Sequence, residues 1–339
     1  MSSATASPQI TYISDDQLRW ERRKRGRTFI FIDQHGREVS PEHQARLRAL
    51  VIPPAWKEVR LASKPAAHIQ AVGYDAKGRK QYIYHSLWTA QQQEAKFDRM
   101  IRFGEILPDV RAEIAAKMRQ RNLTPDKVLS TVVWLLEHTF IRVGNSTYAK
   151  TNKSYGLTTL REKHVTLEDG QVNFSFKGKS GVFHDVEITN ARVAKIIQQC
   201  IELPGYEVFQ YLDEDGQRRA VDSQAVNTFL RELTGEDFTA KDFRTWGGSS
   251  LAVAALCEAG DFTTEKEAKK KIVQAVRTVS QHLRNTPATC RAYYIHPSVL
   301  TAYAEQKLLP HFAECKECYS RETCRLPLLE YATWTLLKA

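Results

Sequence analysis

The spacing of apolar residues changes near Ser86, and this change constrains the fold more than any other feature of the sequence. Before Ser86, apolar and polar residues alternate in short runs such as "RGRTFIFIDQHGREV" and "KQYIYH". After it, apolar residues recur at helical spacing in "SLWTAQQQEAKFDRMIRFGEILPDVRAEIAAKMRQR". Alternation is typical of strands, and spacing of three to four residues is typical of helices. We therefore predict an α+β chain, with a mostly antiparallel β domain over residues 1–90 and a larger, mainly helical domain over residues 91–339.

The first domain is expected to contain two hairpins. The alternation in residues 25–39 is interrupted at "DQHG", and that in residues 68–85 is interrupted at "DAKG". Asp and Gly are frequent in tight turns because both tolerate the backbone angles that a turn requires. Both tetrapeptides are therefore predicted to be hairpin turns.

The second domain is expected to be helical, with one hairpin embedded among the helices. Thr124 followed by Pro125 is typical of a helix start, and further helical patterns cover residues 189–202, 222–234, 241–259 and 264–283. Alternation returns in "QVNFSFKGKSGVFHDVEIT", where the segment "KGKSG" is typical of a turn. This hairpin should present Lys179 at its tip.

The balance of charge favours a polyanionic partner. The chain of 339 residues has 49 Lys and Arg against 39 Asp and Glu, a net charge of +10. Such a surface attracts nucleic acid through the phosphates and the release of their counterions. No apolar run is long enough to cross a membrane, and the N-terminus lacks the apolar stretch of a signal peptide. We expect an intracellular protein with no membrane partner.

The six cysteines indicate neither a disulfide framework nor a strong metal motif. Cys200, Cys257 and Cys290 are widely separated, and an intracellular setting keeps such thiols reduced. The tail over residues 311–339 contains a Cys-x2-Cys with a third cysteine and a histidine nearby: His311, Cys315, Cys318 and Cys324. This spacing does not match the strong zinc patterns. We predict no metal site and interpret the tail as a helix with reduced thiols.

A tyrosine pair in "NTPATCRAYYIHP" raises the question of chemistry at a phosphate. Tyr293 and Tyr294 can be explained by packing alone, as most tyrosine pairs are. A tyrosine that attacks a phosphodiester needs positive neighbours, since a phenol has a pKa near 10. The planar guanidinium of arginine can bind the non-bridging oxygens of the phosphate, and a lysine can protonate the DNA oxygen that departs. The chain offers Arg142, Lys179 and Arg244 for these roles.

The order of these segments resembles the type IB DNA topoisomerases, in the small form found in poxviruses and many bacteria. The matching blocks are "IRVGN…Y…K…YGLTTL", "FKGK", "KDFRTWGG" and "NTP…AYYIHP", and the match extends from about Ile52 to Pro297. The resemblance implies that the β domain and the helical catalytic domain close around duplex DNA as a C-shaped clamp.

The resemblance also implies the site residues. The first catalytic arginine corresponds to Arg142, the hairpin lysine to Lys179, the second arginine to Arg244 and the nucleophile to Tyr294 rather than Tyr293. Asn285 lies where most viral and nuclear members have histidine. Asparagine can donate a hydrogen bond to a phosphoryl oxygen but cannot carry charge or move a proton.

Further positions match segments of the family that contact DNA. In the β domain, "GRKQYIYH" resembles a segment that contacts the major groove and the phosphates. A strand points alternate residues to the same side, so we expect Tyr82 and Tyr84 to point the same way with Arg79 and Gln81 nearby. A half-exposed aromatic strand face is the alternative. The helical domain adds Tyr148, Lys150 and Lys153.

Together these inferences predict a topoisomerase that relaxes supercoils through a 3′-phosphotyrosyl link and a free 5′-hydroxyl. Because the link retains the energy of the phosphoester, religation needs no ATP, and the arginines perform the role of a metal, so no cofactor is expected. The expected partner is double-stranded DNA, bound by a monomer that is cytoplasmic and associated with the nucleoid.

Three alternatives remain open at this stage. A tyrosine recombinase uses nearly the same residues but commonly carries His-x-x-Arg, whereas this chain has Lys241-x-x-Arg244. A basic DNA-binding protein without activity is the second. A metal-dependent type IA enzyme is suggested only by Asp213, Asp215 and the Cys-rich tail, and "YLDEDGQRRAV" is more typical of a hairpin turn.

Overall fold

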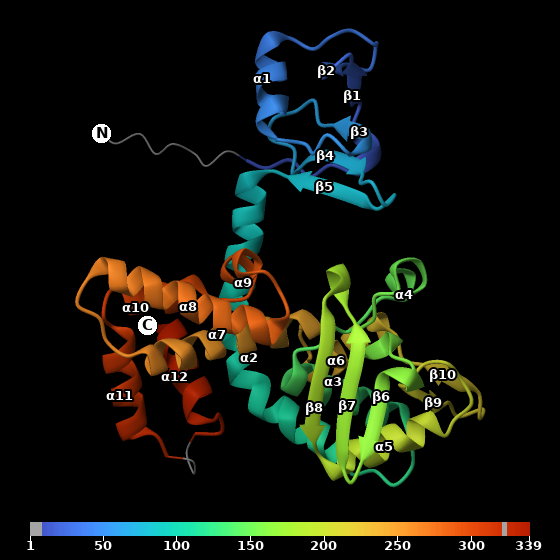
Figure 1. Ribbon diagram of the computed structural model, residues 1–339, viewed down its shortest axis with the longest axis vertical. Helices are drawn as coiled ribbons and strands as arrows, with labels where there is room; N and C mark the ends of the chain where they lie inside the picture. The colour runs from blue at the N-terminus through green and yellow to red at the C-terminus, as the bar shows by residue number, and fades with distance from the viewer. Residues whose placement is uncertain (1–8, 321–323) are drawn as a thin grey trace. The chain divides into compact units, whose positions relative to one another are not determined.

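The computed structural model describes residues 9–320 and 324–339 (Figure 1). The contacts divide the chain into two compact units, residues 1–96 and 97–339. The architecture is α+β, as predicted from the change in apolar spacing. Residues 1–8 of the predicted β domain and residues 321–323 of the predicted Cys-containing tail lie outside the described residues.

The first unit is built on an antiparallel sheet of order β2-β1-β3-β4-β5. One helix, α1 (Pro41–Ala49), begins after Ser40, whose Oγ accepts from the backbone N–H of His43 at 3.4 Å. Phe31, Leu47 and Leu61 are buried together in the core of this unit. The strands are β1 (Trp20–Arg25), β2 (Thr28–Ile32), β3 (Lys57–Leu61), β4 (Ile69–Tyr74) and β5 (Lys80–Tyr84), preceded by a 3-10 turn, Asp15–Gln17.

Both predicted turns are present, although the one at "DQHG" closes a single bridge rather than a pair of strands. "DAKG" joins β4 to β5 as predicted, with the N–H of Asp75 donating to the carbonyl of Arg79 at 2.9 Å. "DQHG" also forms its predicted turn, where the N–H of Asp33 donates to the carbonyl of Arg37 at 2.8 Å and Ile32 forms an isolated antiparallel bridge with Glu38. The hairpin β1–β2, which was not predicted, turns earlier, at Gly26. Gly26 has φ 62°, which a side chain disfavours. The turn at "DQHG" was recognised from the sequence, and the turn ten residues before it was missed.

The second unit is mainly helical, and α2 enters it from the first unit. Thr124 caps α3 as predicted, since its Oγ1 accepts from the N–H of Lys127 at 3.2 Å. The four helical patterns from residue 189 onward correspond to α5–α8, with ends within two residues of the predicted bounds. The helices are α2 (Ser86–Lys117), α3 (Pro125–Thr139), α4 (Ser146–Asn152), α5 (Ala191–Ile201), α6 (Ser223–Thr234), α7 (Ala240–Ala259), α8 (Glu265–Leu283), α9 (Pro287–Tyr293), α10 (Pro297–Ala304), α11 (Leu308–Cys318) and α12 (Leu328–Lys338), with 3-10 turns at Leu157–Thr159, Glu162–His164 and Lys179–Gly181.

The embedded hairpin is confirmed as β7 (Gln171–Lys177) and β8 (Phe183–Thr189), and it belongs to a three-stranded antiparallel sheet. The additional strand is β6 (Val165–Glu168), which pairs with β7 and was not predicted. "YLDEDGQRRAV" forms the hairpin of β9 (Gln210–Leu212) and β10 (Arg218–Ala220), as expected. The turn between them is closed by the N–H of Asp213, which donates to the carbonyl of Gln217 at 2.9 Å.

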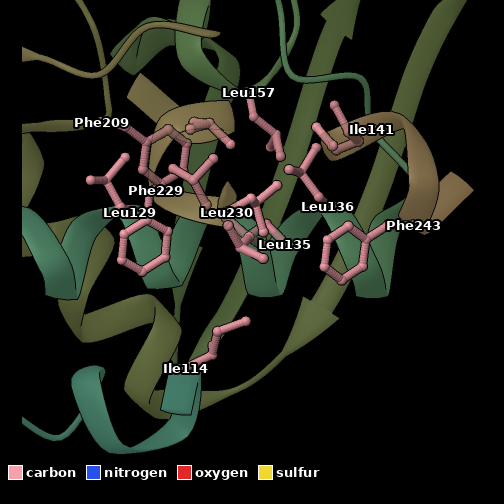
Figure 2. Packing of buried hydrophobic residues seen from close by; sticks show 14 of the residues in the cluster. Ile114, Leu129, Leu135, Leu136, Ile141, Leu157, Phe209, Phe229, Leu230 and Phe243 are labelled. Carbon is pink, nitrogen blue, oxygen red and sulfur yellow. The ribbon is translucent and has the colours of Figure 1, made fainter. Parts of the chain in front are cut away.

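A continuous apolar core joins this sheet to the helices (Figure 2). Leu135 and Leu136 of α3 are fully buried among residues of α2, α6 and α7, including Ile114, Phe229 and Phe243. Helix α3 is one of the most buried helices of the unit, and it anchors the start of the segment that follows it. That segment carries Arg142.

The C-terminal helix is part of this unit rather than an appendage. Arg111 of α2 forms ion pairs of 2.5 Å with Glu137 of α3 and 2.8 Å with Glu330 of α12. The indole N–H of Trp334 donates to the carbonyl of Ile101 at 3.1 Å. Paired carboxylates keep the guanidinium charged despite its burial, and they raise the pKa of Arg111.

Candidate active site

Tyr294 lies at the end of α9, where its backbone is tightly held. Its N–H donates to the carbonyl of Cys290 at 2.9 Å, and its own carbonyl accepts from the Ser249 hydroxyl of α7 at 3.4 Å. The side chain of Tyr294 is half-buried, whereas neighbouring Tyr293 is 42% exposed. The two tyrosines therefore occupy different environments, and Tyr294 is the one that faces the interior.

Arg244 of α7 is buried beneath Tyr294. Only 3% of Arg244 is exposed, and its guanidinium carbon lies 5.1 Å from the centre of the Tyr294 ring. The guanidinium donates to the carbonyl of Phe140 and, at 2.7 Å, to that of Leu283. Burial and the nearby charge of Arg142 lower the pKa of Arg244 to about 10, so it remains protonated at neutral pH.

Arg142 and Asn285 meet from opposite sides of the site. Arg142 follows α3, and its guanidinium donates to the side-chain oxygen of Asn285. Asn285 follows α8, which ends where Arg284 takes a left-handed backbone with φ 51°. Burial lowers the pKa of Arg142, while Tyr294 and Cys290 raise it. Four residues separated by up to 152 positions in sequence are thus brought together.

These residues keep hydrogen-bond donors that no protein group satisfies. Arg142 Nη1, Arg244 Nε and Asn285 Nδ2 are buried and have no hydrogen-bond partner among the residues that the structure describes. A buried donor without a partner costs about 1–3 kcal/mol, so such atoms are rare in a native protein. Three of them at one place fit a group with several acceptor oxygens and negative charge, and a phosphate is such a group.

Lys179 is the fifth predicted site residue. It is exposed at the tip between β7 and β8, and within residues 9–320 and 324–339 no hydrogen bond or ion pair joins it to Arg142, Arg244, Asn285 or Tyr294. The structure therefore brings four of the five predicted residues together. A long side chain at an exposed tip is free to approach a bound substrate.

His184 of β8 is a buried residue of this region that the sequence analysis missed. It is 2% exposed, and its pKa is lowered by burial and by the positive charges of Arg142, Arg284 and Arg244. The available signal was the strand pattern, in which His184 takes an inward position otherwise filled by apolar side chains.

The predicted aromatic face of β5 is present, and Lys80 lies on the same side of the strand. Tyr82 and Tyr84 are 39% and 38% exposed, and their rings stack at 5.8 Å. Gln81 points to the opposite side and donates to Asp75 at 3.1 Å, while Arg79 forms an ion pair with Asp75 at 2.6 Å. Lys80, which the prediction omitted, shares the exposed side with the tyrosines, as strand alternation requires.

Tyr148, Lys150 and Lys153 lie on or next to α4. This short helix begins after Asn145, whose side chain accepts from the N–H of Tyr148 at 3.1 Å. Tyr148 is 49% exposed, and both lysines are exposed. The three side chains are therefore accessible to a partner.

Two family models match the chain. The model of the eukaryotic DNA topoisomerase I catalytic core matches residues 79–314, and that of the bacterial DNA topoisomerase IB N-terminal domain matches residues 28–75. The chain belongs to the type IB DNA topoisomerase family. It is 34% identical to DNA topoisomerase 1B of Acanthamoeba polyphaga mimivirus, over 83% of this chain and 86% of the relative. DNA topoisomerase 1B of vaccinia virus (strain Copenhagen) is 22% identical, over 70% of this chain and 73% of the relative.

Membership in the type IB family decides among the alternatives that the sequence left open. The chain is a type I DNA topoisomerase, an isomerase, rather than a recombinase, a type IA enzyme or a DNA-binding protein without activity. The bacterial form of the N-terminal domain is also as predicted. DNA is the substrate of this family.

The cysteine tail of this topoisomerase contains a compact polar cluster. Cys315 Sγ lies 3.5 Å from His311 Nε2 and 3.3 Å from Thr335 Oγ1, and Cys315 is buried whereas Cys318 is exposed. In the described part of the chain, no group of three or more His, Cys, Asp or Glu side chains has the geometry to hold a metal ion. None of the helices in that part is both long and apolar enough to cross a membrane.

Proposed function

We propose that this topoisomerase cleaves one strand of duplex DNA with Tyr294 and relaxes supercoils while the strand is held as a 3′-phosphotyrosyl link. The observation that carries the proposal is the half-buried tyrosine close to the buried Arg244, the partly buried Arg142 and Asn285, each of which keeps an unsatisfied donor in the described chain. A phosphodiester held by those donors is placed against the Tyr294 hydroxyl.

The proposed roles follow from charge. As the tyrosine oxygen attacks, negative charge builds on the non-bridging oxygens, and the unsatisfied donors Arg142 Nη1 and Arg244 Nε bind it. Asn285 donates a neutral hydrogen bond to the same group. Its carbonyl oxygen orients Arg142, so Asn285 also fixes the direction of that guanidinium.

Lys179 completes the proposed reaction as the general acid. The Tyr294 Oη–P bond forms, the P–O5′ bond breaks, the phenol proton passes to solvent and the Lys179 ammonium protonates O5′. In religation the O5′–P bond forms as the 5′-hydroxyl attacks, the neutral Lys179 amine takes its proton, the Tyr294 Oη–P bond breaks and the departing phenolate takes a proton from solvent. The link retains the energy of the original ester, so no ATP is consumed, and the arginines supply the charge that a metal would supply.

The two units are proposed to act as the two halves of a C-shaped clamp. Residues 1–90 would contact duplex DNA through Arg79, Gln81, Tyr82 and Tyr84, and residues 91–339 would contact it through Tyr148, Lys150 and Lys153. We further propose that a monomer suffices, since all the proposed catalytic residues lie in one chain, and that the enzyme acts in the cytoplasm at the nucleoid.

The test compares two tyrosine variants. Tyr294→Phe should bind DNA and form no covalent adduct, whereas Tyr293→Phe should keep substantial activity because it loses at most one hydrogen bond, about 1 kcal/mol. Adducts are measured on denaturing gels with labelled DNA, and relaxation of positive and negative supercoils is measured in EDTA without nucleotide. An adduct on Tyr294→Phe, or strict dependence on Mg²⁺ or ATP, contradicts the proposal.

A further inference from the structure

The tip that carries Lys179 is joined to the backbone of the arginine cluster. The N–H of Tyr155 donates to the carbonyl of Lys177, the last residue of β7, at 2.9 Å. Two residues later, the N–H of Leu157 donates to the carbonyl of Arg142, also at 2.9 Å. A short segment therefore ties the base of the tip to the segment that presents the first arginine.

His184 lies directly under this tip. Its ring stacks on Phe176, its antiparallel partner in β7, with centroids 4.7 Å apart and planes 11° apart. An ideal Cβ placed on Gly178 would lie 2.6 Å from His184 Nε2, a distance that real Cβ atoms do not reach. The edge of the imidazole therefore contacts the backbone of Gly178, the residue immediately before Lys179.

This contact explains why residue 178 is a glycine. Its φ of −92° is open to any residue, so the backbone conformation does not require glycine. The His184 imidazole occupies the space that a side chain at residue 178 would need. The N–H of Gly178 donates to the carbonyl of Val182 at 2.8 Å and closes the turn. The His184 ring and this hydrogen bond together set the direction in which the Lys179 side chain leaves the hairpin.

The ring is held in its neutral form by its surroundings. Burial, with the positive charges of Arg142, Arg284 and Arg244, lowers the pKa of His184 to about 4. Arg284 also contacts the same strand, donating to the carbonyl of Asp185 at 3.4 Å. His184 Nδ1 is buried and has no hydrogen-bond partner in the described chain, so the ring is held by packing rather than by a polar network.

We infer that His184 is a positioning residue for the reaction: its ring supports Gly178 and thereby aims Lys179 at the departing 5′-oxygen. The inference rests on the role proposed above for Lys179. It assigns no proton transfer to His184 itself, and the proton given to O5′ is still that of the lysine ammonium.

A DNA substrate with sulfur in place of the bridging 5′-oxygen tests the inference. A thiolate leaves without being protonated, so such a substrate does not need the general acid. His184→Ala should form the adduct about 10- to 100-fold more slowly than the parent on ordinary DNA. On the sulfur substrate its rate should return to that of the parent, as should the rate of Lys179→Ala. Glu187→Ala, an exposed change on the same strand, should match the parent on both substrates.

Two further variants keep the test decisive if His184→Ala folds poorly. Gly178→Ala retains the ring but pushes the tip away from it, and it should show the same slowing and the same recovery with sulfur. His184→Gln places an amide nitrogen near the position of Nε2 and should restore part of the rate on ordinary DNA.

The outcomes separate the inference from the function on which it rests. Equal slowing of His184→Ala and Gly178→Ala on both substrates, with recovery of Lys179→Ala on the sulfur substrate, overturns the positioning role and leaves Lys179 as the acid. Failure of Lys179→Ala to recover overturns the role of Lys179 and the inference with it. An adduct on Tyr294→Phe overturns the proposed function itself.

Discussion

At the scale of single residues, the site combines buried positive charge with unsatisfied donors. Arg244 is almost fully buried and still uses two of its nitrogens on backbone carbonyls, which fix its fork in place. Such preorganisation means that little reorientation is needed when charge develops on a phosphate. Burial lowers the pKa of both arginines, and the charge of Arg142 lowers that of Arg244 further, so a bound anion would favour their charged forms.

His184 should make the stability of the protein depend on pH. Its pKa is about 4 in the folded protein and near 6.5 in an unfolded chain, so the unfolded state binds more protons between these values. Stability is therefore full above pH 6.5 and is lost as the pH falls towards 4. Between pH 7 and pH 5, the parent should lose about 2 kcal/mol more free energy of unfolding than His184→Gln.

Urea unfolding of both proteins at the two pH values measures this difference. His164, whose pKa burial also lowers, is present in both proteins, so its contribution cancels in the comparison. Equal losses for the parent and His184→Gln would show that the imidazole is not held neutral.

At the scale of elements, α7 packs closely against the backbone of Tyr294 and so positions the nucleophile. An ideal Cβ on Gly248 would lie 2.5 Å from the carbonyl oxygen of Tyr294 and 3.2 Å from Leu283 Cδ1. Leu283 also accepts a hydrogen bond from Arg244. The absence of a side chain at Gly248 thus lets one helix hold both the nucleophile and the arginine beneath it.

Gly248→Ala should disturb this arrangement, because backbone atoms cannot yield as easily as a side-chain end. We expect a loss of about 1–3 kcal/mol in the free energy of unfolding. Adduct formation should slow about 10- to 100-fold at temperatures where the variant is fully folded. Ser250→Ala on the same helix removes a buried hydroxyl that has no partner in the described residues, and it serves as the control. Normal adduct formation by Gly248→Ala would show that α7 does not set the position of Tyr294.

The cysteines of α11 and the segment after it are expected to be dispensable for relaxation. They lie beyond the nucleophile in sequence, and only Cys315 is buried. Replacing Cys315, Cys318 and Cys324 with Ser should leave the relaxation rate within about two-fold and cost about 1 kcal/mol of stability at Cys315. Stoichiometric zinc in the purified parent, with loss of activity on chelation, would contradict this expectation.

Some elements could be predicted from the sequence because their signals are local. Thr124 and Pro125 indicate the start of α3. Strict alternation of apolar residues on either side of "KGKSG" indicates the β7–β8 hairpin. Helix α1 could not be predicted in this way, since Leu47 is its only buried residue and a single apolar position gives no period. Strand β6 was missed for a similar reason, because two of its four residues are exposed, the other two are only partly buried, and the strand depends on β7 for pairing.

The site shows the same division between local and non-local information. Motif order located Arg142, Arg244, Asn285 and Tyr294, and the structure brings them together. Sequence order could not show that the edge of the His184 ring touches Gly178, since that contact depends on the register of two strands. Gln81 was also named near the two tyrosines of β5, and Lys80 was omitted, although strand alternation places Lys80 on the same exposed side as those tyrosines.

At the scale of the whole molecule, the excess of positive charge should govern how the enzyme grips DNA. The net charge is +10, but many of the cations are already neutralised by ion pairs within the protein, as Arg111 is by two glutamates. Affinity for DNA depends on the cations that remain available to phosphates and release counterions on binding. Lys150 and Lys153 are exposed, and no ion pair to either is found in the described chain.

The salt dependence of binding should therefore identify which cations contact DNA. Lys150→Gln and Lys153→Gln should each weaken binding and reduce the slope of log affinity against log salt by about 1, because each removes one phosphate contact. Lys269→Gln removes the same charge from an ammonium that pairs with Glu265 at 3.1 Å on α8, so it should leave the slope unchanged. Tyr148→Phe removes a neutral hydroxyl and should lower affinity at every salt concentration without changing the slope. Fluorescence anisotropy with a labelled duplex over a range of salt concentrations measures all four variants. If the Lys269 variant changes the slope as much as the α4 variants do, the grip depends on net charge alone, and the predicted contacts of Lys150 and Lys153 are wrong.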